Sequence, residues 1–366
     1  MKRVYNFSSG PAILPLEVLK QIQEELLDFN NSGMSILEIS HRSKTYDAVI
    51  KETEKDLREI MNIDSNYKIL FLQGGASRQF SDIPLNLAKN GIFAYITTGQ
   101  FSEKAYKEAK KYGKAYEIAS SKDKDYSYIP DCSNLDIPYN ADYVYICDNN
   151  TIYGSKFHTL PNTKGKPLVA DVSSCFLSEE IDIENYGLVY AGAQKNAGIA
   201  GLTVVIIRED LIQDILPISV ATMSHYKIQV DNESLYNTPP TFSIYVFGKV
   251  LKWIKSVGGL KEIQKRNVEK AKLLYDYLDK SKLFIPLIRK DSRSMMNVTF
   301  KTTSDELDTL FCMEAKKEGL VDLKGHRSVG GIRASIYNAM PIEGVKKLVE
   351  FMKKFEDSVD EDKLIK

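Results

Sequence analysis

The sequence contains no apolar run long enough to cross a lipid bilayer and no excess of charge of either sign. None of its hydrophobic stretches approaches the roughly 18 residues that a membrane-spanning helix needs, and the first ten residues lack the apolar segment of a signal peptide. Lys plus Arg and Asp plus Glu each number 49, so nothing points to nucleic acid or an acidic membrane surface. We therefore expect a cytoplasmic protein with no membrane or nucleic-acid partner.

Cysteine and histidine are also scarce, with four of each in 366 residues. Cys132, Cys147, Cys175 and Cys312 lie far apart, and no two of them form a Cys-x-x-Cys pair. That spacing argues against a disulfide framework and against a zinc site, and it suits a reducing compartment. We expect no metal centre.

The chain is longer than the roughly 250–300 residues at which single hydrophobic cores stop growing, so we expect two domains. Helical spacing covers 15–30, 46–61 and 79–88, whereas short apolar runs predict strands at 68–72, 92–97, 115–118, 143–147, 167–170, 188–191 and 202–207. This alternation predicts an α/β fold in which helices flank both faces of a mainly parallel sheet.

After Pro239-Pro240 the pattern changes to two consecutive helices, 242–257 and 260–278. Strands near 296–301 and 331–336 and helices near 304–318 and 341–355 follow, which predicts a smaller α+β C-terminal domain. We assign residues 16–258 to a large domain and residues 1–15 and 259–366 to a small one.

Asp171 and Lys195 each follow one of the predicted strands. In an open α/β sheet both would lie at the carboxyl edge, where ligands bind. Pyridoxal 5′-phosphate (PLP) needs such a pair, a lysine that bonds it covalently and an acid that keeps its ring nitrogen protonated. Spacing alone does not exclude the alternatives that Lys195 is a surface lysine and that Asp171 caps a helix. Small residues around Lys195 (Ala191-Gly192-Ala193, Gly198 and Gly201) favour the close approach of a flat cofactor.

The residues around Lys195 resemble those of a known enzyme family. The string YAGAQKN, with ADVSS before it and AGLTVVIIRED after it, is similar to the cofactor-lysine segment of the phosphoserine aminotransferases. Further matches run in order through nearly the whole chain, namely FSSGPAILP, ISHRS, GGAS, NNTIYG, NTPPTF and GHRSVGGIRASIYNA. The resemblance implies a PLP-dependent, fold-type I (aspartate aminotransferase-like) enzyme whose large domain holds a seven-stranded sheet. It also implies a homodimer with shared active sites.

The resemblance also implies residue roles in cofactor binding. Lys195 and Asp171 would serve the reactive carbon and the ring nitrogen, and Thr151 would bind the phenolic oxygen. Phe101 stands where the family usually has a tryptophan stacked on the ring, which is a departure. The implied phosphate ligands are Ala76, Ser77 and Gln194, with Asn237 and Thr238 from the neighbouring subunit. Without the resemblance, each position has an ordinary structural explanation. Ala76 and Ser77 fit a βα turn, Phe101 a core position, Thr151 a loop, and Asn237 and Thr238 the start of a helix.

Two His-Arg-Ser strings carry the substrate signal. Guanidinium groups beside imidazole or hydroxyl donors suit a phosphate dianion. The resemblance makes His41, Arg42, His326 and Arg327 a clamp for the substrate phosphate, with the second pair supplied by the partner subunit. It makes Arg333 the ligand of the substrate α-carboxylate, while the side-chain carboxylate of glutamate would use the phosphate site, chiefly Arg42.

The reaction that the resemblance implies transfers an amino group from glutamate to 3-phosphohydroxypyruvate, giving O-phosphoserine and 2-oxoglutarate in serine biosynthesis. Some family members also use phosphohydroxythreonine in pyridoxine biosynthesis, and the sequence leaves that activity open. The alternatives are an aminotransferase of the same fold with another acceptor, a cysteine desulfurase and a non-catalytic PLP- or phosphate-binding module. No cysteine has a convincing setting for a desulfurase, and the presence of both Lys195 and Asp171 argues against a silent module.

Overall fold

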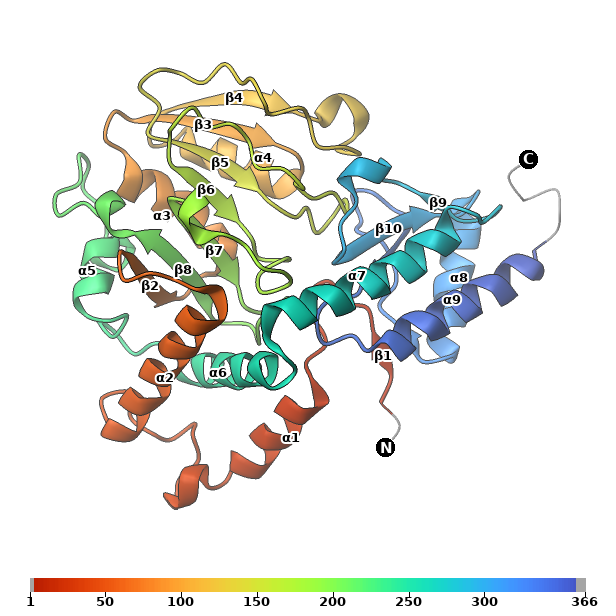
Figure 1. Cartoon of the computed structure of the whole chain (residues 1–366), viewed down its shortest axis with the longest axis horizontal. Helices are drawn as coiled ribbons and strands as arrows, with labels where there is room; N and C mark the ends of the chain where they lie inside the picture. Colours follow the sequence, from red (N-terminus) through yellow and green to blue (C-terminus); the bar gives the residue numbers. More distant parts are fainter. Residues whose placement is uncertain (1–2, 360–366) are drawn as a thin grey trace.

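In the computed structural model, which describes residues 3–359, a seven-stranded sheet forms the centre of the larger part of the chain (Figure 1). Its strands, in spatial order, are β2 (Tyr67–Leu72), β8 (Thr203–Arg208), β7 (Leu188–Gly192), β6 (Leu168–Asp171), β5 (Tyr143–Cys147), β3 (Ile92–Thr97) and β4 (Lys114–Ser120). Neighbouring strands from β7 to β4 are parallel, and β8 runs antiparallel to both β7 and β2. The predicted mainly parallel sheet is confirmed.

Helices cover both faces of this sheet. One face packs against α3 (Gly75–Leu87) and α4 (Gln100–Ala109) through a buried cluster that includes Phe80, Ile83 and Ala105. The opposite face packs against α2 (Lys44–Met61) and α6 (Thr241–Ser256). The central strands are buried along their whole length, which explains why they are apolar on both sides.

The smaller part combines helices α7 (Gly259–Leu278), α8 (Asp305–Lys317) and α9 (Ile342–Asp357) with five short strands. Strands β9 (Ile285–Pro286), β10 (Asn297–Lys301) and β12 (Ile332–Ser335) form an antiparallel sheet. Strand β1 (Tyr5–Asn6) pairs in parallel with β11 (Leu320–Val321), so this early segment lies against the C-terminal part of the chain.

Two hydrophobic cores support a division into two domains. Phe7 and Ile13 pack with the C-terminal core, whereas α2 and the central sheet share another. Helix α7 contributes Leu260 and Ile263 to the large core and its later turns to the small one. We propose domains of 16–258 and of 1–15 with 259–366, joined along the first turns of α7. Residues 1–2 and 360–366 of this division lie outside the described part of the chain.

The structure differs from the predicted elements mainly at their ends. Helix α1 (Leu16–Glu25) stops before the predicted residue 30, because Asp28 accepts a hydrogen bond from the backbone of Gly33 and Asn30 adopts a left-handed conformation. Helix α3 begins at Gly75, before the predicted residue 79, and α5 (Tyr226–Asp231) was not predicted. Within residues 3–359, none of the helices is long and apolar enough to span a membrane.

Candidate active site

The carboxyl edge of the central sheet carries Asp171 and Lys195, as the strand pattern predicted. Asp171 is the last residue of β6, and Lys195 lies three residues beyond the end of β7. Strands β6 and β7 are parallel neighbours, with Asp171 opposite Tyr190 in the register. The two functional candidates therefore leave the sheet at the same edge.

The amine of Lys195 has an unusual set of neighbours for a lysine. Its Nζ donates to the Thr151 hydroxyl over 2.8 Å and lies 5.0 Å from the centre of the Phe101 ring. Among the described residues it forms no ion pair. Burial lowers the pKa of Lys195, and the Asp171 carboxylate is the largest influence that opposes this shift. The amine is therefore easier to deprotonate than an ordinary lysine.

Asp171 is held as an acceptor on both oxygens. Its side chain is 4% exposed, and its Oδ1 accepts from the backbone N–H of Ser173 over 2.9 Å. Its Oδ2 accepts from the Tyr190 hydroxyl over 3.2 Å. Both oxygens of this buried carboxyl group therefore already accept a hydrogen bond from within the fold.

The turn between β2 and α3 leaves a helix N-terminus open. Gly74 has a φ of 98° and caps α3 without a side-chain hydrogen bond. Ala76 and Ser77 lie in the first turn of the helix, whose free N–H groups and dipole attract anions. Gln194 follows β7 at the same edge of the sheet, where its backbone carbonyl accepts from Ala12.

Arg333 brings the small domain to this edge. Its guanidinium donates to the Thr151 carbonyl over 3.2 Å and to the Ser9 hydroxyl over 2.8 Å. Burial, and then the charges of Arg333 and Arg327, lower the pKa of the His326 imidazole. Thr151, Lys195 and Arg333 form one hydrogen-bonded group within a single chain.

The remaining predicted residues lie apart from this group. His41 and Arg42 precede α2, and within residues 3–359 neither side chain has a hydrogen bond to the residues around Lys195. The Nε2 atom of His41 is buried without a partner. Asn237 lines a hollow with Gly74 and Arg78, and the Thr238 carbonyl accepts from Gln73 over 3.4 Å.

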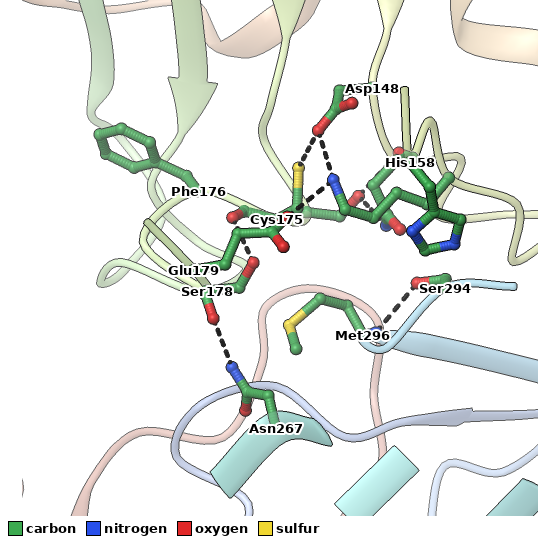
Figure 2. A network of polar contacts seen from close by, with 12 residues as sticks. Asp148, His158, Cys175, Phe176, Ser178, Glu179, Asn267, Ser294 and Met296 are labelled. Carbon is green, nitrogen blue, oxygen red and sulfur yellow. Dashed lines mark hydrogen bonds and ion pairs between the residues drawn. The ribbon is translucent and has the colours of Figure 1, made fainter. Parts of the chain in front are cut away.

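A buried polar network next to Thr151 was not predicted from the sequence. Figure 2 shows Asp148 accepting from the thiol of Cys175 and from a lysine amine, which belongs to Lys156. Lys156 also pairs with Glu179 over 2.8 Å. Burial lowers the pKa of Lys156, but the carboxylates of Asp148 and Glu179 raise it by more, so it lies above its ordinary value. The polar string DNNTIYGSK, unusual directly after an apolar strand, was the available signal.

The same region is fastened to the small domain. Asn149 donates to Ser174 over 2.7 Å and to Asn297 over 2.8 Å, and Figure 2 shows Asn267 on α7 donating to the carbonyl of Ser178. These bonds fix the segment that carries Thr151 between the two domains. Tyr190, the buried partner of Asp171, and Tyr145, which bonds the Tyr190 hydroxyl, were also missed; tyrosines within apolar strands were their signal.

Comparisons with known proteins give a consistent result. A curated phosphoserine aminotransferase from Bacillus cereus is 53% identical over 357 residues, which cover 97% of this chain and 99% of that protein. A solved phosphoserine aminotransferase from Bacillus circulans subsp. alkalophilus has a TM-score of 0.95 and 47% identity, covering 98% of this chain and 99% of that one. A PLP-bound phosphoserine aminotransferase from Trichomonas vaginalis has a TM-score of 0.92 and 39% identity, covering 96% and 100% of the two chains.

These likenesses span the whole length of the proteins concerned, so the predicted resemblance and the predicted fold class are both confirmed. The family model described as "Aminotransferase class-V" matches residues 4–348, a range that includes the sheet edge, Lys195 and Arg333. The chain belongs to the class-V aminotransferase family.

Proposed function

We propose that this protein is a phosphoserine aminotransferase that uses PLP bound to Lys195. The observation that carries the proposal is the amine of the half-buried Lys195, which lies against a hydroxyl and an aromatic ring, near an acid and without an ion pair among the described residues. An amine in that setting is a nucleophile and a base. Relatives that are about half identical along their full length bear the same enzyme name.

The residues at the sheet edge fit PLP. Lys195 would bond the cofactor, Asp171 would face its ring nitrogen, Phe101 would lie against its ring, and Thr151 would bind its phenolic oxygen. Phenylalanine offers less stacking area than tryptophan but has the same flat face. The phosphate would bind at the α3 N-terminus, where the implied ligands are Ala76, Ser77 and Gln194, with Asn237 and Thr238 of the partner subunit.

When bound, PLP supplies an electron sink for the negative charge that develops at Cα of the amino-acid substrate. The protein's own groups do the rest. The Lys195 amine takes the proton from Cα, and a lowered pKa suits that task because it favours the neutral amine. The Asp171 carboxylate keeps a proton on the ring nitrogen. Arg333, half-buried and bonded to Thr151 and Ser9, orients the substrate by its α-carboxylate.

The substrate phosphate would bind between two His-Arg pairs, His41-Arg42 and His326-Arg327, with the second pair supplied by the partner subunit, as the resemblance implies. We therefore propose a homodimer with shared sites, in which glutamate places its second carboxylate where the phosphate binds, chiefly on Arg42. Serine biosynthesis in the cytoplasm is the corresponding role, and phosphohydroxythreonine remains a second candidate substrate.

A coupled assay of the purified protein with glutamate and 3-phosphohydroxypyruvate tests this function. We expect 2-oxoglutarate to form over many turnovers, and we expect Lys195→Ala to abolish turnover while keeping the fold. An absorption band near about 410–430 nm, typical of PLP linked to a lysine, should also be lost in that variant. Multiple turnovers by Lys195→Ala would refute the assignment. If the assay failed with 3-phosphohydroxypyruvate but succeeded with another 2-oxo acid, the chain would be an aminotransferase with a different acceptor.

A further inference from the structure

Four tyrosines lie in the core beneath the active-site edge of the sheet. Tyr95 on β3, Tyr143 and Tyr145 on β5, and Tyr190 on β7 are each at most 1% exposed. They belong to the cluster that packs under α3 and α4. A hydroxyl buried this deeply is costly unless it forms a hydrogen bond, and all four do so.

The hydroxyls form two pairs of the same length. Tyr95 and Tyr143 are joined over 2.7 Å, and so are Tyr145 and Tyr190. The pairs differ in one respect, because the Tyr190 hydroxyl continues to Oδ2 of Asp171 over 3.2 Å.

Strand register explains how Tyr145 reaches Tyr190 across an intervening strand. Tyr145 is opposite Val169 of β6, and Asp171 of β6 is opposite Tyr190 of β7. Side chains alternate along a strand, so Val169 and Asp171 share the face that carries the tyrosines. On that face the hydroxyls of Tyr145 and Tyr190 meet over 2.7 Å, and Tyr190 also bonds the Asp171 carboxylate.

The chemistry of the groups fixes the direction of this chain of hydrogen bonds. Burial raises the pKa of both Tyr145 and Tyr190, so each keeps its single O–H proton. A carboxylate only accepts, so Tyr190 must donate to Asp171. Its proton is then committed, and Tyr145 must donate to the Tyr190 oxygen. No carboxylate fixes a direction for the pair of Tyr95 and Tyr143.

We propose that Tyr190, supported by Tyr145, is a positioning residue that keeps Asp171 as the charged partner of the cofactor's ring nitrogen. The inference rests on the proposed function, in which Asp171 faces that nitrogen. One proton is shared between the ring nitrogen and the Asp171 carboxylate. Because Tyr190 donates to Oδ2 of Asp171, it stabilises the carboxylate and so favours the proton on the ring nitrogen. Donation from Tyr145 polarises the Tyr190 O–H and strengthens its bond to Asp171. Tyr190 itself would not touch the substrate.

The test uses full-length protein loaded with PLP that carries ¹⁵N in its ring. The nitrogen resonance reports how the proton is divided between the ring and Asp171. In Tyr190→Phe we expect the nitrogen resonance to move toward that of the unprotonated ring. The shift should correspond to about a tenfold fall in the ratio of protonated to unprotonated ring nitrogen. Tyr145→Phe should shift the resonance in the same direction by less. Tyr143→Phe removes an equally buried hydroxyl from the other pair, so its resonance should match that of the wild type.

If the ring-nitrogen resonance had the same position in Tyr190→Phe as in Tyr143→Phe, the inference would be overturned while the proposed function stayed intact. Failure of the wild-type protein to bind PLP would overturn both. If Tyr190→Phe did not fold, Tyr145→Phe would decide, because it leaves the bond between Tyr190 and Asp171 in place; a wild-type resonance in Tyr145→Phe would then count against the inference. The rate of amino-group release from glutamate should fall in the same order as the resonance shifts.

Discussion

Three lysines in this chain, two of them buried (Lys156 and Lys270) and one half-buried (Lys195), keep their amines in different surroundings. Lys156 lies between the carboxylates of Asp148 and Glu179, Lys270 donates to the carbonyls of Ile336 and Tyr337, and Lys195 donates to a hydroxyl. Burial alone lowers the pKa of all three, and only the paired carboxylates of Lys156 reverse the shift. Lys195 alone among them combines a lowered pKa with an aromatic ring and the nearby Asp171, as a cofactor-binding base requires.

Lys156→Met should destabilise the protein by about 3–5 kcal/mol, because it leaves two carboxylates in the interior without their cation. Lys252→Met is the matched control, since it breaks a pair with Glu52 whose side chains are 45% and 56% exposed. Such a pair contributes about 1 kcal/mol or less. Urea unfolding of both variants measures the loss in free energy of unfolding relative to the wild type. Equal losses in Lys156→Met and Lys252→Met would show that the Lys156 network does not stabilise the protein.

Arg327→Ala should raise the Michaelis constant for 3-phosphohydroxypyruvate about ten- to a hundredfold, since it removes a charged hydrogen-bond donor from the proposed phosphate clamp. Affinity for PLP should hardly change. Arg289→Ala provides the control, because Arg289 pairs with Asp291 at the surface and lies outside the proposed site. Steady-state kinetics check the prediction, and a wild-type Michaelis constant in Arg327→Ala would exclude this arginine from the clamp.

At the scale of elements, strands were the easiest feature to predict. Strands β3 and β5 have the predicted bounds, because central parallel strands are continuous apolar runs. The start of α3 was missed, since Gly74 and Gly75 read as a turn although Gly75 already belongs to the helix. Lys195 and Asp171 could be proposed as site residues because strand ends define the ligand edge. The Tyr190 contact depends on register between strands, which one sequence does not reveal.

Gly74→Ala should weaken PLP binding through the first turn of α3. Gly74 has a φ of 98°, and an added Cβ would come within 2.6 Å of the Arg78 Cβ, so the turn must shift. Gly165→Ala is the control, because Gly165 also has a positive φ, of 80°, but its Cβ would meet no atom within 4 Å. In both variants an alanine must adopt a left-handed backbone conformation, which costs about 1–2 kcal/mol. A PLP titration should separate them, and equal affinities would argue against phosphate binding at this turn.

On the scale of the whole molecule, α7 holds the two hydrophobic cores together. Asn267 donates to Ser178 of the large domain, and three residues later Lys270 donates to two carbonyls that follow β12. A neutral amine has two N–H groups, which match these two acceptors. Burial lowers the pKa of Lys270 to about 7. The seam between the domains therefore depends on a lysine whose charge changes near pH 7.

Stability should depend on pH through Lys270. Between about pH 7 and the ordinary lysine pKa of 10.5, the unfolded chain binds a proton at this site that the folded chain does not. The free energy of unfolding should therefore rise with pH across that window and lose this contribution below it. Lys270→Met should flatten the rise, whereas Lys261→Met, at an exposed position of the same helix, should keep it. Denaturant titrations at several pH values provide the measurement, and parallel curves for the wild type and Lys270→Met would contradict the prediction.

The most direct measurement for the account as a whole is chemical mapping of the lysine that bonds the cofactor. The wild-type protein is loaded with PLP, reduced with borohydride to fix the bond, and digested for peptide mass mapping. The account predicts the cofactor on Lys195, in the peptide that follows β7. A label on Lys156, Lys270 or another lysine, or no label at all, would contradict it.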